Sequence, residues 1–147
     1  MKQSGLGDAF YIAGVDLSGD IGSLGSIHGG PAVHDVTGID KSAMERIGGL
    51  RDGSIEFTAF FNDAVGQSHL TLKANVFTQV LDFNATYCRG TALGGEAAFI
   101  VARQLNYDQS RAQDGALTSG VTEAADGFGL DWGRQITAGK RTDKTAT

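Results

Sequence analysis

The sequence is poor in the features that signal secretion, cysteine-based metal binding or membrane insertion. Cys88 is the single cysteine, which excludes an internal disulfide and a zinc site built from cysteines. No segment approaches the roughly 18 consecutive apolar residues of a membrane-spanning helix. Residues 1–14 lack the uninterrupted apolar core of a signal peptide. We therefore expect a soluble protein that is made and kept in a cytoplasm.

Basic charge and proline are also scarce. The 147 residues include 12 Lys and Arg against 17 Asp and Glu, a formal net charge of −5 that excludes a general duplex-binding protein. One proline stands against 22 glycines, so we expect many turns and bulges. A hydrophobic fraction of 41% in a chain of this length fits one folded domain with a modest core.

Alternation of apolar and polar residues predicts a chain made mostly of strands. The clearest strand is residues 54–61, where Ile55, Phe57, Ala59 and Phe61 share one face, while Glu56, Thr58 and Phe60 share the other. Further strands are expected at 9–17, at 18–30 in a weak or bulged form, at 32–38, 80–90, 116–124 and 129–137. Residues 96–108 could be a strand or a helix, and the run Phe99-Ile100-Val101 favours a strand. Asp114-Gly115 marks a hairpin turn.

Helical signals are few and short. Ser42 and Glu45 stand in the spacing of a capping box, which predicts a short helix that ends at Gly48-Gly49. Residues 62–76 predict a second helix with Asn62 or Asp63 as its cap. We expect a mainly β fold, a sandwich or barrel with one or two short helices on its side, as a single domain over residues 1–136. For the polar residues 137–147 we expect a C-terminal arm or a disordered segment.

No pattern in the chain points clearly to catalysis or to a cofactor. Nucleophilic catalysis by Ser42 would need a nearby base with an orienting carboxylate, and its local sequence offers a capping box instead. A metal site from His28, His34 and Asp35 is conceivable, but their spacing matches no standard ligand pattern. A small hydrolase using His34, Asp35 and Ser42 stays open as an alternative. We expect no enzyme activity, no metal and no cofactor, but a protein that binds or assembles.

Several stretches, in order, resemble major tail (tail tube) proteins of long-tailed actinobacterial phages. They are GDAFYIAGVDLSGDIGSL, DVTGIDKSAMERIGGLRDGSIEFTAFFN, TYCRGTALGGEAAFIVARQLNYDQSRAQDGALT and GLDWGRQITAGKRT. The resemblance spans about residues 7–142. The family commonly has a Leu-Pro link before the strand near residue 80, and this chain has none there.

The resemblance implies a virion structural protein with a tail-tube-like β-sandwich. Its hexameric rings would stack into a hollow tube through which DNA passes without specific binding. Its partners would be further copies of itself, the tail tip and the tape-measure protein, and it would be assembled in the host cytoplasm. A capsid decoration protein or a minor tail protein is the alternative within the same virion class.

The resemblance also suggests which residues meet neighbouring subunits and which face the channel. The segment before the strand at 54–61 looks like a connector that touches a neighbouring subunit. Candidate interface residues are Lys41, Arg46, Arg51, Asp52 and Phe60, the last exposed beside Phe57 and Phe61. An acidic channel wall would repel phosphates, with Glu56, Asp82 and Glu123 as candidates. The basic residues Lys140, Arg141 and Lys144 would lie outside the tube or between rings.

Overall fold

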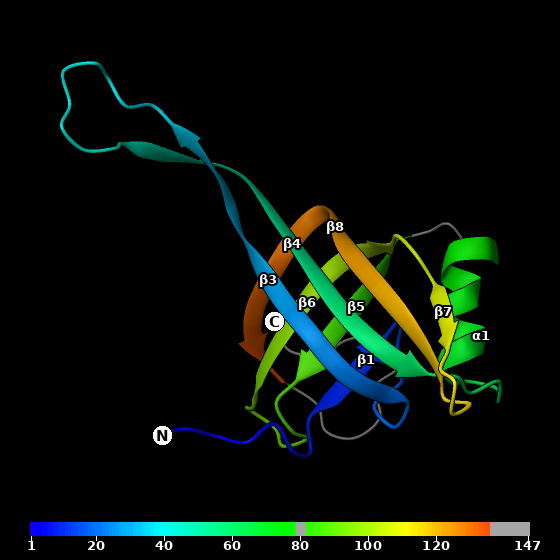
Figure 1. The fold of residues 1–147 in the computed structure, drawn as a ribbon. Helices are drawn as coiled ribbons and strands as arrows, with labels where there is room; N and C mark the ends of the chain where they lie inside the picture. Colours follow the sequence, from blue (N-terminus) through cyan, green and yellow to red (C-terminus); the bar gives the residue numbers. More distant parts are fainter. Residues whose placement is uncertain (79–81, 136–147) are drawn as a thin grey trace.

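A computed structural model describes residues 1–78 and 82–135, and this part of the chain is mainly β (Figure 1). The strands are β1 (Ala9–Ile12), β2 (Val15–Asp16), β3 (Ile21–Asp35), β4 (Arg46–Phe60), β5 (Phe83–Cys88), β6 (Glu96–Gln104), β7 (Asp108–Arg111) and β8 (Leu117–Arg134). The helices are α1 (Ser68–Lys73) and the π-helix η1 (Ala74–Thr78). No helix in this described part is long and apolar enough to cross a membrane. The expected C-terminal arm at 137–147, with Lys140, Arg141 and Lys144, lies outside the described residues.

All strands join one antiparallel sheet that curls over itself. The order is β2-β1-β5-β6-β8-β4-β3, and β7 adds to β8. Three strands separate β1 from β4, which would put them roughly 19 Å apart in a flat sheet at about 4.8 Å per strand. The rings of Phe10 on β1 and Phe57 on β4 instead lie 5.0 Å apart. The two halves of the sheet therefore face each other across one core, as expected of a sandwich or barrel.

The core follows from the period-two pattern of the strands. On β4, Ile55, Phe57 and Ala59 are buried, as predicted, while Phe60 is exposed. Phe57 therefore forms no exposed patch with Phe60, contrary to our expectation. On β6 the core positions are Ala98, Ile100 and Ala102, whose small and branched side chains let the two halves of the sheet approach closely.

The helix predicted from Ser42 to Ile47 is wrong. Residues 36–45 form an irregular loop, and Ile47 already belongs to β4. A helix this short is unstable in water unless it packs an apolar face against other elements. This segment connects two strands far from the core, so nothing is available for that packing (Figure 1).

Four predicted strands merge into two long ones. Strand β3 joins most of the strands predicted at 18–30 and 32–38, from Ile21 to Asp35, and the expected bulges appear as shifts in its pairing with β4. Strand β8 (Leu117–Arg134) likewise joins the strand predicted at 116–124 to the described part of the one predicted at 129–137, because Gly127 forms a bulge, with a positive φ of 84°, rather than a turn. Glycine therefore interrupts the register of these strands without ending them.

Helix α1 starts later than predicted and its start is held from a distance. Neither Asn62 nor Asp63 caps it, and Gln67 at the N-cap position makes no side-chain cap bond. The carboxylate of Asp20 accepts a bond of 3.0 Å from the amide of Ser68 and one of 3.1 Å from Asn62 Nδ2. A distant acid thus satisfies a free amide at the helix start.

Two opposed glycines let β3 and β4 pass against β8. Gly29 and Gly53 are direct partners across β3 and β4. A Cβ on Gly53 would lie 2.6 Å from Leu130 Cβ and 2.7 Å from the Leu130 amide, and one on Gly29 would lie 2.8 Å from Leu130 Cβ. Leu130 is 6% exposed and belongs to the core. Neither glycine can carry a side chain at this crossing. We call it the arm root, because the distal halves of β3 and β4 project from it as an arm (Figure 1).

Gly53→Ala should therefore destabilise the fold. Because the new methyl group meets backbone atoms of β8, we expect a loss of about 1–3 kcal/mol in the free energy of unfolding, measured by thermal or denaturant melting. Gly120→Ala is the matched control, since a Cβ there meets nothing within 4 Å. Equal effects of the two substitutions would contradict the close approach at the arm root.

Candidate assembly interface

The distal halves of β3 and β4 form a projection, the arm (residues 31–50), that leaves the body of the protein (Figure 1). Strand β4 pairs with β8 only from Ser54 to Phe60, so the arm is a ribbon of two strands. Every residue from 31 to 48 is exposed. Two-stranded ribbons have no core of their own and are marginally stable alone. The arm therefore has the form of an element that contacts another molecule.

Local contacts hold the arm in one register. His34 pairs with Ile47 and Asp35 pairs with Arg46, beyond a bulge between Pro31 and Val33. A Cβ on Gly49 would lie 2.5 Å from His34 Nε2, so the His34 ring occupies the space that this glycine leaves. The arm is thus ordered by its own side chains before any partner arrives.

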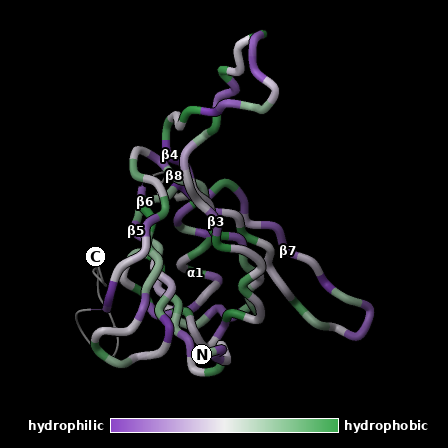
Figure 2. The backbone as a smooth tube through the Cα atoms, turned by 90° about the vertical axis from the view of Figure 1, so that its left-hand side faces the viewer, coloured by the Kyte–Doolittle hydropathy of each residue, from purple (hydrophilic) through white to green (hydrophobic). Residues whose placement is uncertain are grey.

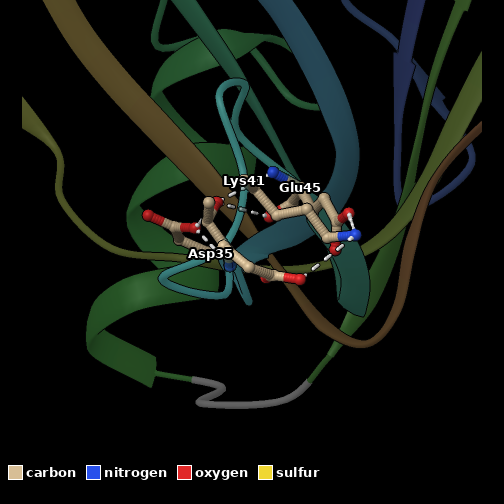
Figure 3. A network of polar contacts seen from close by, with 5 residues as sticks. Asp35, Lys41 and Glu45 are labelled. Carbon is tan, nitrogen blue, oxygen red and sulfur yellow. Dashed lines mark hydrogen bonds and ion pairs between the residues drawn. The ribbon is translucent and has the colours of Figure 1, made fainter.

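A polar network closes the tip loop (residues 36–45), as Figure 3 shows. The Thr37 hydroxyl donates to Asp35 Oδ1 and accepts a bond of 2.8 Å from the Glu45 amide. The Val36 amide donates to the Glu45 carbonyl at 3.0 Å. Lys41 forms an ion pair of 3.5 Å with Glu45. The bonds from the side chain and the amide of Thr37 lower the pKa of Asp35, so its carboxylate remains the acceptor at neutral pH.

Apolar side chains stand exposed along this ordered arm. Ile39 is fully exposed and Leu50 is 88% exposed. Val33, Val36, Met44 and Ile47 are also exposed. Figure 2 shows hydrophobic and hydrophilic residues interspersed over the arm. Burying one such side chain fully contributes about 1.5–3 kcal/mol, so the arm holds binding energy that the isolated chain does not use. Sequence analysis missed Ile39 and Leu50, although apolar residues inside a charged, glycine-rich run were the available signal.

Four of the five candidate interface residues lie along one projection, from its tip loop to its base. Lys41 and Arg46 lie on the arm, and Arg51 and Asp52 lie where the arm joins the body. Phe60 lies at the opposite end of β4, about 45 Å from Arg46 at about 3.3 Å per residue. Its ring covers Gly22, where a Cβ would come within 2.9 Å. Phe60 therefore belongs to a different surface from the arm.

Arg51 also makes an internal contact at the arm root. Its Nη2 donates to the Leu130 carbonyl at 3.0 Å and lies 3.7 Å from an Asp131 carboxylate oxygen. A groove of about 480 Å³ adjoins it, with the half-exposed Trp132 on its wall. Ile27, Pro31 and Leu130 are among the other lining residues. Arg51 thus fixes the arm to the body beside a concave, partly apolar surface.

Two of the three candidate channel residues share the outer face of the sheet. Glu56 is exposed and pairs across β4 and β8 with Thr122. Asp82 forms an ion pair of 3.2 Å with Arg103, which also meets Asp126 at 3.3 Å. Much of the charge of Asp82 is therefore compensated, whereas Glu56, among the described residues, accepts a single long bond of 3.5 Å from Ser26 Oγ.

The third candidate, Glu123, does not face outward. Its side chain is 0% exposed and lies on the core face of β8 in phase with Val121. Alternation along β8 makes this unavoidable once Val121 is buried. The spacing of Val121, Glu123 and Ala125 was the sequence signal that could have identified it.

The candidate catalytic and metal residues are not assembled into a site. Asp35 bonds Thr37 rather than His34 or Ser42. His28 Nε2 lies 2.6 Å from Ser54 Oγ on the neighbouring strand. Within residues 1–78 and 82–135, no three His, Cys, Asp or Glu side chains gather in a way that could hold a metal ion.

Comparison with solved structures finds the same fold in viral-like particles. A chain from the tail of an empty gene transfer agent particle, described with C6 symmetry, aligns with a TM-score of 0.67 and 18% identity, over 88% of this chain and 98% of that chain. A chain from the virion of a native gene transfer agent particle aligns with a TM-score of 0.65 and 15% identity, over 88% and 99%. The sequence matches no family profile and no curated protein. The fold is thus the mainly β, tail-tube-like one that the sequence predicted.

Proposed function

We propose that this chain is a structural subunit of a phage-type tail, whose copies form rings that stack into a tube for DNA. The observation that carries the proposal is the arm, an ordered ribbon with exposed apolar residues and no core of its own. The likeness to a chain from a C6-symmetric tail, over nearly the full length of that chain, supports this class of assembly and a hexameric ring. Fold alone would not decide function, so the arm is needed beside it.

The arm favours a ring or a filament over a two-fold symmetric dimer. A projection on one surface that docks into a different surface of the next copy makes a heterologous contact, which produces rings or filaments. The charges of Lys41, Arg46 and Asp52 would set the register of that contact. The arm of one subunit would thus join it to its neighbours in a stack.

The remaining assignments follow from the same proposal. The protein would be a virion component of a long-tailed phage, of the actinobacterial type that the sequence resembles, assembled in the host cytoplasm. The tail tip and the tape-measure protein would be its partners besides its own copies. We assign it no catalytic role and no cofactor.

The purified full-length protein should assemble by itself. At tens of micromolar, we expect sedimentation velocity to detect species far larger than the 15.3 kDa monomer. Negative-stain microscopy should show rings or tubes as wide as a phage tail. A stable monomer would contradict the proposal, and binding solely to preformed capsids would indicate a decoration protein.

Removing apolar side chains from the arm should block assembly without unfolding the subunit. For Ile39→Ser with Leu50→Ser, we expect the concentration needed for assembly to rise at least about tenfold, because each side chain contributes about 1.5–3 kcal/mol when buried. The melting temperature should stay unchanged, since both side chains are exposed in the subunit. Val65→Ser, at a residue 91% exposed near α1, is the control and should assemble normally. The arm would lose its role if the control were equally impaired.

The outer sheet face that carries Glu56 should line the channel. Around Glu56 this face is polar, with Ser26, Thr58 and Thr122, whereas the exposed Phe60 lies at its end. In assembled tubes, Glu56→Lys should increase DNA retention and its dependence on salt, because each added phosphate contact steepens that dependence. Asp63→Lys makes the same charge change at an exposed residue before α1 and should have no effect. A map of the tube with an inner wall dominated by Lys and Arg would refute this placement.

A further inference from the structure

The buried carboxyl of Glu123 lies directly across from the buried amide of Gln104. The two residues are register partners on β8 and β6, with 0% and 5% exposure. Directly opposed side chains project from the same face of a sheet with Cβ atoms about 4.5–5.5 Å apart. Both side chains therefore enter the same part of the core.

Gln104 connects this pair to helix α1. Its Nε2 donates to the Leu72 carbonyl at 3.0 Å and to the Asn106 carbonyl at 3.1 Å. Leu72 lies in the last turn of α1, where the α-helix gives way to the π-helix η1. Both amide hydrogens of Gln104 are used in these bonds, while its Oε1 has no hydrogen-bond partner among the described residues.

Glu123 likewise has no bonding partner in the described part of the chain, for either carboxylate oxygen. Its other cross-strand neighbour is Ile55 on β4, and Leu72 belongs to the same core cluster as Ile55. A buried polar atom without a partner costs about 1–3 kcal/mol, and a buried charge costs more. Protonation of Glu123 would provide a hydrogen that its carboxyl group can donate to Gln104 Oε1, so that both groups gain a partner.

Within residues 1–78 and 82–135, no other ionisable group neutralises Glu123. On the core faces beside it, β4 presents Ile55 and β6 presents Ala102, neither of which titrates. From the helix side, His69 is engaged by the Tyr107 hydroxyl at 2.9 Å and Lys73 is exposed. The charged residues Glu56, Arg103 and Asp126 lie on the outer face. Burial is accordingly the sole cause that raises the pKa of Glu123 well above its ordinary value.

We propose that protonated Glu123 donates a hydrogen bond to Gln104 Oε1, and that this pair is a proton-dependent fastener that holds α1 and η1 on the sheet. In the protonated form every polar atom of Gln104 has a partner, and its amide is oriented towards Leu72. Loss of the proton leaves a carboxylate facing a carbonyl oxygen, so the carboxylate draws in water and Gln104 turns away from the helix. This device is independent of the proposed role in a tail.

The direction of the pH effect follows from linkage. An acid whose pKa is higher in the folded state than in the unfolded state favours folding most when it is protonated. Its stabilising contribution is complete below the unfolded pKa of about 4.3 and is lost as the pH rises through the folded pKa. Between these two values, the opening equilibrium of the helix should shift by up to about tenfold per pH unit.

Amide hydrogen exchange on the whole chain tests whether protonated Glu123 holds α1 on the sheet. For residues 68–73, protection factors corrected for intrinsic exchange should fall as the pH rises from 5 towards 9. Glu123→Gln supplies a neutral donor at all pH values, so its protection factors should stay constant and exceed those of the wild type at high pH. Glu56→Gln is the matched control, an exposed acid next to Ile55, the residue that pairs with Glu123 on β4, and it should keep the wild-type profile.

Three results would overturn the proposal. One is the same pH slope in Glu123→Gln and the wild type. Another is a loss of protection that is equal in α1 and in the central strands, because Glu123 would then affect only global stability. If Glu123→Gln fails to fold, the carboxyl carbon of Glu123 in the wild type can be titrated by NMR, and a midpoint near 4.3 or below would refute the device. Gln104→Met should loosen α1 at every pH, since it removes the bond to Leu72.

Discussion

The length of β4 relative to its partners is the constraint on which the rest of the structure depends. From Ser54 to Phe60 the strand lies between β3 and β8, and its alternate residues enter the core. Beyond Gly53 it keeps β3 but loses β8, so neither face of the remaining ribbon can be buried within the subunit. A strand pair that continues past its sheet has to be stabilised by local contacts or by another molecule. In the arm, local contacts stabilise the tip loop, and the exposed apolar residues are available to contact another molecule.

The arm root fixes the position of the arm relative to the body of the protein. Gly29 and Gly53 let the two strands pass against Leu130, which fills the space that side chains would otherwise occupy. Arg51 then bonds the Leu130 carbonyl, so the arm leaves the sheet at a position determined by both packing and a hydrogen bond. Because an assembly needs its projections in a defined direction, a rigid root matters as much as the exposed residues at the tip. Gly29, Gly53 and Arg51 together provide that rigidity.

Polar groups inside the fold connect elements that are distant in sequence. Asp20 satisfies the start of α1, and Gln104 contacts its end at Leu72. Helix α1 has few buried residues of its own, Ser68 and Leu72, so these two polar contacts contribute a large share of its attachment. The unpartnered oxygens of Glu123 and Gln104 lie at one of these contacts, which makes the helix sensitive to a single proton. The charge of Glu56, next to Ile55 in sequence but on the outer face, has no such influence because water solvates it.

Alternation in the sequence by itself determined the mainly β class and the buried face of β4 at Ile55, Phe57 and Ala59, and the Asp114-Gly115 pair indicated the turn between β7 and β8. It did not determine that Ser42 and Glu45 lie in a loop, that β3 and β8 run on through their glycines, or that Glu123 is buried. Periodicity is local, since it reports which residues share a face over a few positions. Whether a strand continues, which face meets the core and where a strand outruns its neighbours depend on pairing between distant segments, and only the tertiary structure decides these.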